Sequence, residues 1–302
     1  MSKVIVTGGA GFIGSHLTDA LINRGYQVIV IDNLSAGKRE NVNSKAEFHQ
    51  LDLRELEKIK PLFFGVDFIF HLAAKPRIPL SIKDPISSHE NNLNTTLNVL
   101  VAARDAKVKK VVYVSSSSVY GNQETLPQRE DMQAQPLNPY ALQKYVGELY
   151  CKIFSELYGL PTVVVRYFNV YGPRAPIEGS YATVISIFLR QKQKGEPLTI
   201  TGDGTQKRDF TFVNDIVEGT ILTALKPIEK GEVINIGGGS NYSINRLAEL
   251  IGGHKVYIPK RPGEVKESLA DTSKAKKLLD WQPKFDLEKG LKETAKSYGI
   301  SI

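Results

Sequence analysis

In the first half of the chain, short runs rich in β-branched residues alternate with longer segments of helical pattern. Runs such as "KVIVT" at 3–7 and "QVIVI" at 27–31 are apolar at nearly every position. Such strands are typical of a parallel sheet covered by helices on both faces, because neither side of the strand meets water. The pattern predicts a doubly wound, Rossmann-like α/β domain. Further strands are expected at 47–50, 67–73, 110–115 and 162–166.

Beyond residue 170 the rhythm changes to shorter helical segments separated by glycine- and proline-rich stretches. Examples are "GPRAPIEGS" and "NIGGGSNYS". We expect residues 1–170 to form a cofactor-binding Rossmann domain, and residues 171–302 to form a smaller, mixed α/β substrate lobe with segments interleaved with the first. Helices are expected near 181–193, 214–225, 243–251 and 286–298.

Composition narrows the class of protein. The chain has 302 residues, of which 41% are hydrophobic, which is enough for a buried core, and no apolar stretch reaches the length of a membrane span. The single cysteine, Cys151, excludes an internal disulfide and a multi-cysteine metal site. The net charge is +7, and the lysines and arginines are dispersed among acidic residues. This dispersion favours a solvated surface over nucleic-acid binding, and the positive balance suits anionic substrates. We expect a cytoplasmic protein that binds neither membrane, nucleic acid nor metal.

The first predicted strand runs into the glycine-rich turn "TGGAGFIG", which contains Gly8, Gly11 and Gly14. Glycines at this spacing allow a tight turn and close approach of a pyrophosphate, whose charge then lies at the N-terminus of the following helix. Phe12 and Ile13 lie inside the motif. The motif alone is weak, but its place between a strand and a helix predicts a dinucleotide site.

Asp32 ends the second strand and can accept hydrogen bonds from an adenosine ribose, which favours NAD over NADP. The alternative is that Asp32 only begins the turn "DNLSAG". Asp52 follows the third strand and is a weaker candidate for a contact with adenine. The predicted cofactor site is completed by Asn33, Leu53, Leu72, Ala73 and Ala74, together with Tyr140 and Lys144.

Tyr140 and Lys144 of "NPYALQKYVGE" are four residues apart and share one face of a helix. Tyrosine titrates near pH ~10, but a nearby positive charge favours the phenolate. Lys144 and the positive nicotinamide ring would both supply it, so Tyr140 could accept a hydroxyl proton as hydride leaves the same carbon. The pair alone fits an ordinary amphipathic helix, but the glycine turn and the serine-rich strand end "VSSSSVYG" favour catalysis.

Several motifs together are typical of one group of enzymes. They are "TGGAGFIG", "DNLSAGKRENV", "HLAA", "SSSSVYG", "PYALQK", "RYFNVYGP" and "RDFTFV". With them the chain resembles the extended short-chain dehydrogenase/reductase superfamily, in particular nucleotide-sugar 4-epimerases of the UDP-glucose and UDP-N-acetylglucosamine type, from Lys3 to about Ala275. The resemblance implies NAD as the cofactor, a UDP-sugar as the substrate and an isomerase reaction through a transient 4-keto sugar.

The resemblance also implies roles for the serines. Ser116 lies four residues before the tyrosine of "VYG" and would hydrogen-bond the sugar 4-oxygen and share its proton with Tyr140, while Ser117 and Ser118 would line the sugar pocket. The alternative for Ser116 is a cap on the turn after the strand. The related 4,6-dehydratases carry an Asp-Glu pair at this strand end, so serines favour epimerisation over dehydration.

The resemblance implies that Asn169 contacts the diphosphate and sugar, that Arg208 and Arg261 pair with the phosphates, and that Glu264 contacts the uridine ribose. The planar guanidinium fork suits phosphate, although an arginine without context more often forms a surface salt bridge. Four residues after Glu264, Ser268 occupies the position where members restricted to plain hexoses carry a tyrosine. A small residue there implies that UDP-GlcNAc and UDP-GalNAc also fit, unless Ser268 is a loop residue that faces away.

Other interpretations remain open. UDP-glucuronate epimerisation or decarboxylation would need a cation for the sugar carboxylate, for which Arg77 and Arg174 are candidates, and a net reductase would consume NADH. A cofactor-sensing or RNA-binding protein without catalysis is the remote alternative. The predicted helices beginning near Asn91 and Pro139 resemble the pair that forms a four-helix interface in this superfamily, which implies a homodimer.

Overall fold

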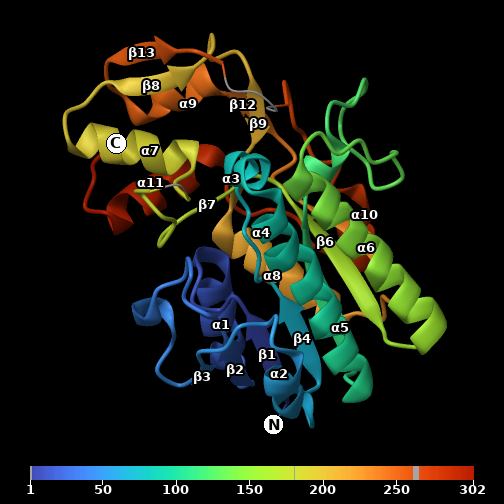
Figure 1. Cartoon of the computed structure of the whole chain (residues 1–302). Coiled ribbons are helices and arrows are strands. Elements are labelled where there is room, and N and C mark those ends of the chain that lie inside the picture. Colours follow the sequence, from blue (N-terminus) through green and yellow to red (C-terminus); the bar gives the residue numbers. More distant parts are fainter. Residues whose placement is uncertain (1, 180, 261–264) are drawn as a thin grey trace.

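The computed structural model describes residues 2–179, 181–260 and 265–302. Its centre is a seven-stranded sheet in the order β11-β6-β5-β4-β1-β2-β3, and all neighbouring strands are parallel (Figure 1). This confirms the predicted Rossmann-like fold. The strands are β1 Lys3–Thr7, β2 Gln27–Ile31, β3 Glu47–His49, β4 Phe68–His71, β5 Lys110–Ser116, β6 Thr162–Tyr167 and β11 Glu232–Ile236.

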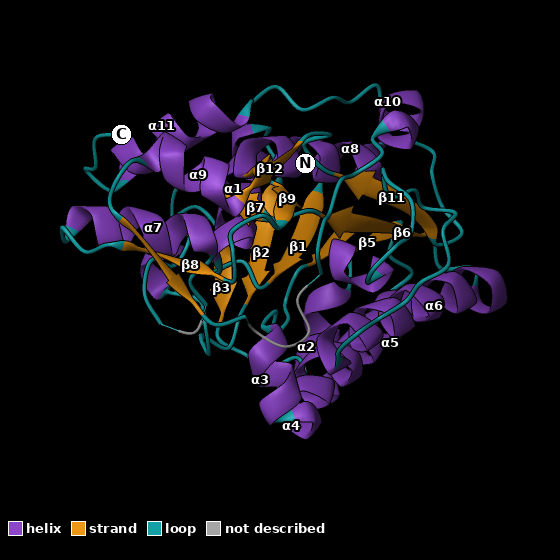
Figure 2. Cartoon of the chain, turned by 90° about the horizontal axis from the view of Figure 1, so that it is seen from above, coloured by secondary structure: helices purple, strands orange, loops and turns teal. Residues whose placement is uncertain are grey.

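Helices cover both faces of the sheet (Figure 2). Side chains alternate across a strand, so Val4 and Val6 of β1 pack into one core while Ile5 between them packs into the other. The first core includes side chains of α1 Phe12–Asn23, α8 Val213–Leu225 and α10 Ser273–Leu279. The second includes side chains of α2 Leu56–Phe63, α5 Thr95–Asp105 and α6 Pro139–Tyr158.

Short helical segments follow the carboxyl ends of β2, β4 and β5. They are η1 Arg39–Asn41, α3 Ile78–Lys83, α4 Pro85–His89, η2 Glu90–Asn94 and η3 Ser117–Tyr120. The strand order reverses between β1 and β4, and in open α/β sheets a ligand crevice lies at such a reversal, beyond the carboxyl ends of the strands. The glycine turn follows β1 at this place.

The second half of the chain contributes to both parts of the molecule. β11 pairs with β6 along its whole length, and α8 and α10 pack on the same sheet, so the sheet crosses the predicted boundary at residue 170. A separate core lies among α7 Val184–Gln193, α9 Ile244–Ile251 and α11 Leu287–Ser297. The division into two domains stays a prediction.

Two small strand pairs lie in the upper part of the molecule in Figure 1: β8 Leu198–Thr201 with β13 Lys255–Ile258, and β9 Lys207–Asp209 with β12 Asn241–Ser243. A third pair is β7 Val170–Tyr171 with β10 Thr211–Phe212. In the described part of the chain, every helix is too short or too polar to span a lipid bilayer.

Candidate active site

A cavity of about 890 Å³ lies at the carboxyl ends of the parallel strands and extends to α7, β8 and β9. It brings together the predicted cofactor, catalytic and substrate residues that the structure describes. Those residues are Gly8, Gly11, Phe12, Ile13, Gly14, Asp32, Asn33, Asp52, Leu53, Leu72, Ala73, Ala74, Ser116, Ser117, Ser118, Tyr140, Lys144, Asn169, Arg208 and Ser268. Arg261 and Glu264 lie outside the described residues.

The glycine turn fits a dinucleotide because its backbone leaves no room for side chains. Gly8 has a φ of +72°, and a Cβ there would lie 2.9 Å from the backbone of Ala73. A Cβ on Gly14 would lie 2.1 Å from the Gly8 carbonyl oxygen, so only glycine permits this contact between turn and helix. Gly11 caps α1 without a side chain, which leaves the first N–H groups of the helix available to a phosphate.

Asp32 connects the glycine turn to the loop after β2. Its carboxylate accepts hydrogen bonds from the backbone N–H of Ala10 at 3.0 Å and of Leu34 at 2.8 Å. Burial raises the pKa of Asp32, and these two hydrogen bonds oppose the rise. The carboxylate therefore shapes the turn and also lines the cavity where the ribose of a dinucleotide would lie. The glycine turn and this acid together fit NAD.

Asp52 is engaged by its neighbours. Arg54 donates to it from Nε at 3.0 Å and from Nη2 at 2.8 Å, and Asn33 donates to it at 3.2 Å. The hydrogen bonds from Arg54 are the main cause that lowers the pKa of Asp52 to about 2. Asp52 and Asn33 thus form one fixed polar edge of the cofactor part of the cavity.

The start of α6 positions the predicted catalytic pair, Tyr140 and Lys144. The Asn138 side chain accepts a hydrogen bond from the Ala141 N–H at 2.9 Å, and Pro139 occupies the first helical position. Tyr140 follows in the first turn, its backbone N–H donating to the Ser81 Oγ at 3.2 Å. The cap therefore fixes where the helix begins and, with it, where Tyr140 and Lys144 enter the cavity.

Burial is the largest cause of the pKa shifts of Tyr140 and Lys144. It raises the pKa of Tyr140 to about 12, while a hydrogen bond with Ser116 and the charge of Arg77 oppose the rise. Burial also lowers the pKa of Lys144 to about 8. Lys144 Nζ donates to the Val114 carbonyl oxygen at 2.7 Å and lies 5.0 Å from the centre of the Tyr113 ring.

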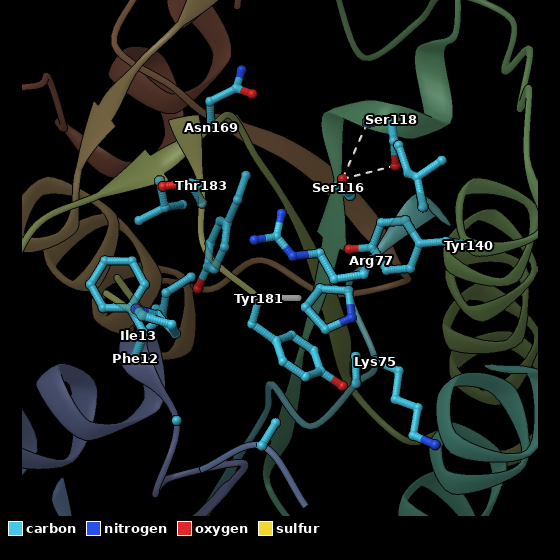
Figure 3. Close-up of a pocket in the computed structure, with 18 of the residues that line it drawn as sticks. Phe12, Ile13, Lys75, Arg77, Ser116, Ser118, Tyr140, Asn169, Tyr181 and Thr183 are labelled. Atoms are coloured by element: carbon cyan, nitrogen blue, oxygen red, sulfur yellow. Dashed lines mark hydrogen bonds between the residues drawn. The ribbon is translucent and has the colours of Figure 1, made fainter. Parts of the chain in front are cut away.

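Arg77 is a functional candidate that the tyrosine–lysine spacing did not reveal. It lines the cavity, and Figure 3 shows its guanidinium directed into the space beside Tyr140. Its charge, rather than that of Lys144, is the nearby positive charge that lowers the pKa of the phenol in this structure. The sequence placed Arg77 only as a carboxylate partner, because its loop is far from Tyr140 along the chain.

The substrate end of the cavity is built around Asn169 and Ser268. The Asn169 side-chain amide donates to the Asp209 carbonyl oxygen at 3.1 Å and to the Ser268 Oγ at 3.2 Å. Ser268 is 3% exposed and also accepts from the Asp209 N–H at 3.4 Å. Arg208 lines the cavity beside them, and its Nη1 donates to the Lys207 carbonyl oxygen at 2.8 Å.

Two arginines considered for a sugar carboxylate have different surroundings. Arg77 lines the cavity, whereas Arg174 forms an ion pair with Asp19 of α1 at 2.7 Å. Arg174 also lies beside His16, so its guanidinium serves the contact between α1 and the loop after β7. This arrangement corrects the expectation that Arg174 is available to a substrate.

Side chains of the second half that the sequence did not single out complete the cavity. Tyr181 and Thr183 precede α7 and Phe188 lies within it, while Thr199 lies on β8 and Gln206 follows that strand. Figure 3 shows Tyr181 and Thr183 facing the same space as Asn169 and Arg77. No local sequence pattern links these residues, because they come from separate short segments that only the fold brings together.

The chain is similar to known UDP-sugar 4-epimerases along nearly its whole length. The model of the NAD dependent epimerase/dehydratase family matches residues 4–237. A UDP-glucuronate 4-epimerase of Thermodesulfobacterium geofontis is 40% identical over 314 residues, covering 97% of this chain and 95% of its own.

Two solved structures are similar throughout. A UDP-glucose 4-epimerase of Thermotoga maritima, solved with UDP-glucose, has a TM-score of 0.95 at 39% identity and covers 98% of both chains. A UDP-N-acetylglucosamine 4-epimerase of Methanobrevibacter ruminantium, in complex with UDP-N-acetylmuramic acid, has a TM-score of 0.94 at 40% identity and covers 98% of both chains. From its glycine turn to its substrate end, the chain belongs to the NAD dependent epimerase/dehydratase family.

Proposed function

We propose that this protein is an isomerase, an NAD-dependent 4-epimerase that interconverts UDP-GlcNAc with UDP-GalNAc and UDP-glucose with UDP-galactose. The main support is that one cavity joins the glycine turn and Asp32 to Ser116, Tyr140 and Lys144. The same cavity continues to Asn169 and Ser268. Relatives with the same fold are UDP-sugar 4-epimerases, which supports the same reaction here.

Bound NAD supplies reversible hydride exchange at the sugar C4. Tyr140 accepts the 4-hydroxyl proton and later returns it, with Ser116 hydrogen-bonded between the phenol and the sugar oxygen. Arg77 adds positive charge near the phenol, which favours the phenolate that burial opposes. Asn169 and Arg208 hold the nucleotide end, so the 4-keto sugar can turn and present its other face.

Ser268 supports acceptance of acetamido sugars. Its hydroxyl lies against Asn169 and Asp209 in the cavity wall, where a tyrosine would add a ring in the same place. A serine leaves that volume open to a substituent at the sugar C2. Plain hexoses, which lack the substituent, fit the same site.

A second candidate is 4-epimerisation of UDP-glucuronate. Arg77 favours it, because its guanidinium faces the cavity near Tyr140 and could pair with a C6 carboxylate. A relative of 40% identity is a UDP-glucuronate 4-epimerase. Decarboxylation of the same sugar would start from the same bound state and is distinguished by its product.

A homodimer in the cytoplasm is part of the proposal. α5 and α6 pack side by side, and α6 carries an exposed apolar stripe on the face away from the sheet. Its members recur at helical spacing: Leu142, Leu149, Ile153 and Leu157. A second copy placed against this stripe would cover it in a four-helix interface. The buried, reduced Cys151 is compatible with a reducing compartment.

The test is proton NMR of the purified protein with UDP-GlcNAc, UDP-glucose and UDP-glucuronate in separate tubes, with catalytic NAD⁺ and no reductant. Anomeric signals of UDP-GalNAc and UDP-galactose are the expected products. Turnover of UDP-glucuronate alone would replace the proposal by the second candidate, and a pentose product would indicate decarboxylation. Reaction only with added NADH would identify a reductase and contradict epimerisation.

A further inference from the structure

One residue supplies two hydrogen bonds to the hydroxyl oxygen of Ser116. The backbone N–H of Ser118 donates to the Ser116 Oγ at 3.2 Å, and the Ser118 Oγ donates to the same atom at 2.9 Å (Figure 3). The first contact makes Ser116 the cap of the short helix η3 at the end of β5. The second is additional to the cap, since it involves the side chain of Ser118.

This pair of contacts decides which way the Ser116 proton can point. A serine hydroxyl has one proton to donate and two lone pairs that accept. Ser118 provides a donor for each lone pair, so Ser116 is left to act as a donor toward a third group. Tyr140 is the group placed to accept it, because its phenol faces the same part of the cavity (Figure 3) and interaction with Ser116 lowers the pKa of that phenol.

We propose that Ser118 is a positioning residue that holds Ser116 as a hydrogen-bond donor toward the Tyr140 oxygen and the sugar oxygen it deprotonates. The inference rests on the proposed function and deepens it. It places Ser118 in the proton-transfer path, acting through Ser116, where the resemblance implied a contact with the sugar. A donor aimed at Tyr140 stabilises its phenolate, whereas an acceptor in the same place would stabilise the phenol.

Other groups near Tyr140 lie on other elements than Ser118, which is in η3. Arg77 faces the phenol from the loop before α3, Tyr113 interacts with it from β5, and Lys144 follows it by one turn on α6. Lys144 donates to the Val114 carbonyl oxygen, and within the described residues neither Lys144 nor Tyr113 is hydrogen-bonded to Ser118. A change in the titration of Tyr140 on substitution of Ser118 therefore reports on Ser116.

Three variants separate the alternatives. Ser118→Ala keeps the backbone N–H but removes the hydroxyl, which frees one lone pair of Ser116 to accept a proton from Tyr140 or the sugar. Ser118→Thr retains a hydroxyl at the same position and should restore the contact. Ser117→Ala is the comparison for a sugar contact, because Ser117 lines the same cavity and its hydroxyl makes no hydrogen bond to Ser116 within the described residues.

Steady-state kinetics over a range of pH give the main result. Ser118→Ala should lower kcat by about tenfold, less than the 10²–10⁴-fold of a general acid–base group itself, with KM for the UDP-sugar nearly unchanged. The limb of the kcat profile that reports Tyr140 should move to higher pH. Ser118→Thr should recover most of the rate, and Ser117→Ala should leave the pH profile in place, with any loss appearing in KM.

Several outcomes would overturn the inference. A raised KM with normal kcat in Ser118→Ala would make Ser118 a sugar contact. Equal losses in Ser118→Ala and Ser117→Ala, with the pH profile in place, would indicate a general disturbance of η3. Unchanged kinetics in Ser118→Ala would show that Ser116 needs no second donor. Circular dichroism and NAD content of each variant check that the fold is intact.

The wild-type NMR assay separates failure of this inference from failure of the proposed function. If the wild type epimerises and Ser118→Ala is equally active, only the inference falls. If the wild type epimerises no UDP-sugar, the proposed function falls, and the role of Ser118 is tested by near-ultraviolet absorbance, which follows ionisation of tyrosines in the NAD-loaded protein as pH rises. The contribution of Tyr140 is the difference between each variant and the same variant carrying Tyr140→Phe. A phenolate that forms at higher pH in Ser118→Ala supports the inference, and an unchanged titration overturns it.

Discussion

Replacement of Glu148 by glutamine should destabilise the protein far more than the same replacement of a surface glutamate. Glu148 lies one turn after Lys144 on α6 and accepts hydrogen bonds from Arg166 Nε at 2.9 Å and Nη2 at 2.6 Å. It also accepts from the Ser115 hydroxyl, next to Ser116. Both charged side chains are 4% exposed, so this ion pair joins β5, β6 and α6 inside the core.

The magnitude follows from burial. Glu148→Gln keeps the shape of the side chain but leaves the Arg166 charge without a buried counter-charge, which costs about 3–5 kcal/mol. Glu156 on the same helix is the matched control. Its pair with Lys152 spans 3.9 Å with the two side chains 60% and 53% exposed. Glu156→Gln should therefore cost at most about 0.5 kcal/mol.

Urea unfolding followed by fluorescence of the single tryptophan, Trp281, measures both losses, because this residue is buried beside the sheet. Protein and NAD concentrations are held equal between variants, since binding to the folded state adds stability. The unfolding midpoint of Glu148→Gln should fall by about 1 M or more with an unchanged slope. The double variant Glu148→Leu with Arg166→Met should be more stable than Glu148→Gln, because it leaves no unpaired charge in the core. A loss below about 1 kcal/mol in Glu148→Gln, or one equal to that of Glu156→Gln, would refute the reasoning.

Four further predictions concern the reaction itself. Tyr140→Phe should lower kcat by about 10²–10⁴-fold while calorimetry finds nucleotide binding intact, and ordinary turnover would remove Tyr140 from proton transfer. Ser268→Tyr should reduce kcat/KM for UDP-GlcNAc more than for UDP-glucose, because the added ring fills space beside Asn169; equal losses would show that Ser268 does not select the C2 substituent. Asp32→Ala should weaken NAD binding in a fluorescence titration, since the turn loses its hydrogen bonds to the carboxylate and the ribose loses its acceptor; unchanged NAD affinity would argue against the ribose contact. Burial lowers the pKa of Lys144 to about 8, and an amine loses its charge as pH rises through its pKa, so kcat/KM should fall above that pH; a profile flat up to the titration of an ordinary lysine, near pH ~10.4, would contradict this.

The sheet and the cofactor end could be predicted from sequence because their signals are local. β1 and β2 match the predicted strands residue for residue, since apolar β-branched runs mark buried parallel strands. Glycine spacing predicts a turn that only glycine can form, and the close contacts of Gly8 and Gly14 show why. The four-residue spacing of Tyr140 and Lys144 likewise needs only one helix.

The rest depends on contacts between distant segments. β11 joins the sheet beside β6 although 64 residues separate Tyr167 from Glu232 in the chain, and no local pattern reveals such a partner. The two-residue strands β7 and β10 exist only as a pair. Arg77 comes near Tyr140 from another loop, and the hydrogen bond between Ser118 and Ser116 depends on how β5 turns into η3.

The most direct test of the account uses UDP-GlcNAc and UDP-glucose deuterated at C4, incubated with the wild-type protein and catalytic NAD⁺ in ordinary water. We expect the 4-epimer to form and to retain its deuterium at C4, because the same hydride that leaves the sugar returns to its other face. An epimer that has lost its deuterium to the solvent, or no epimer from either sugar, would contradict it.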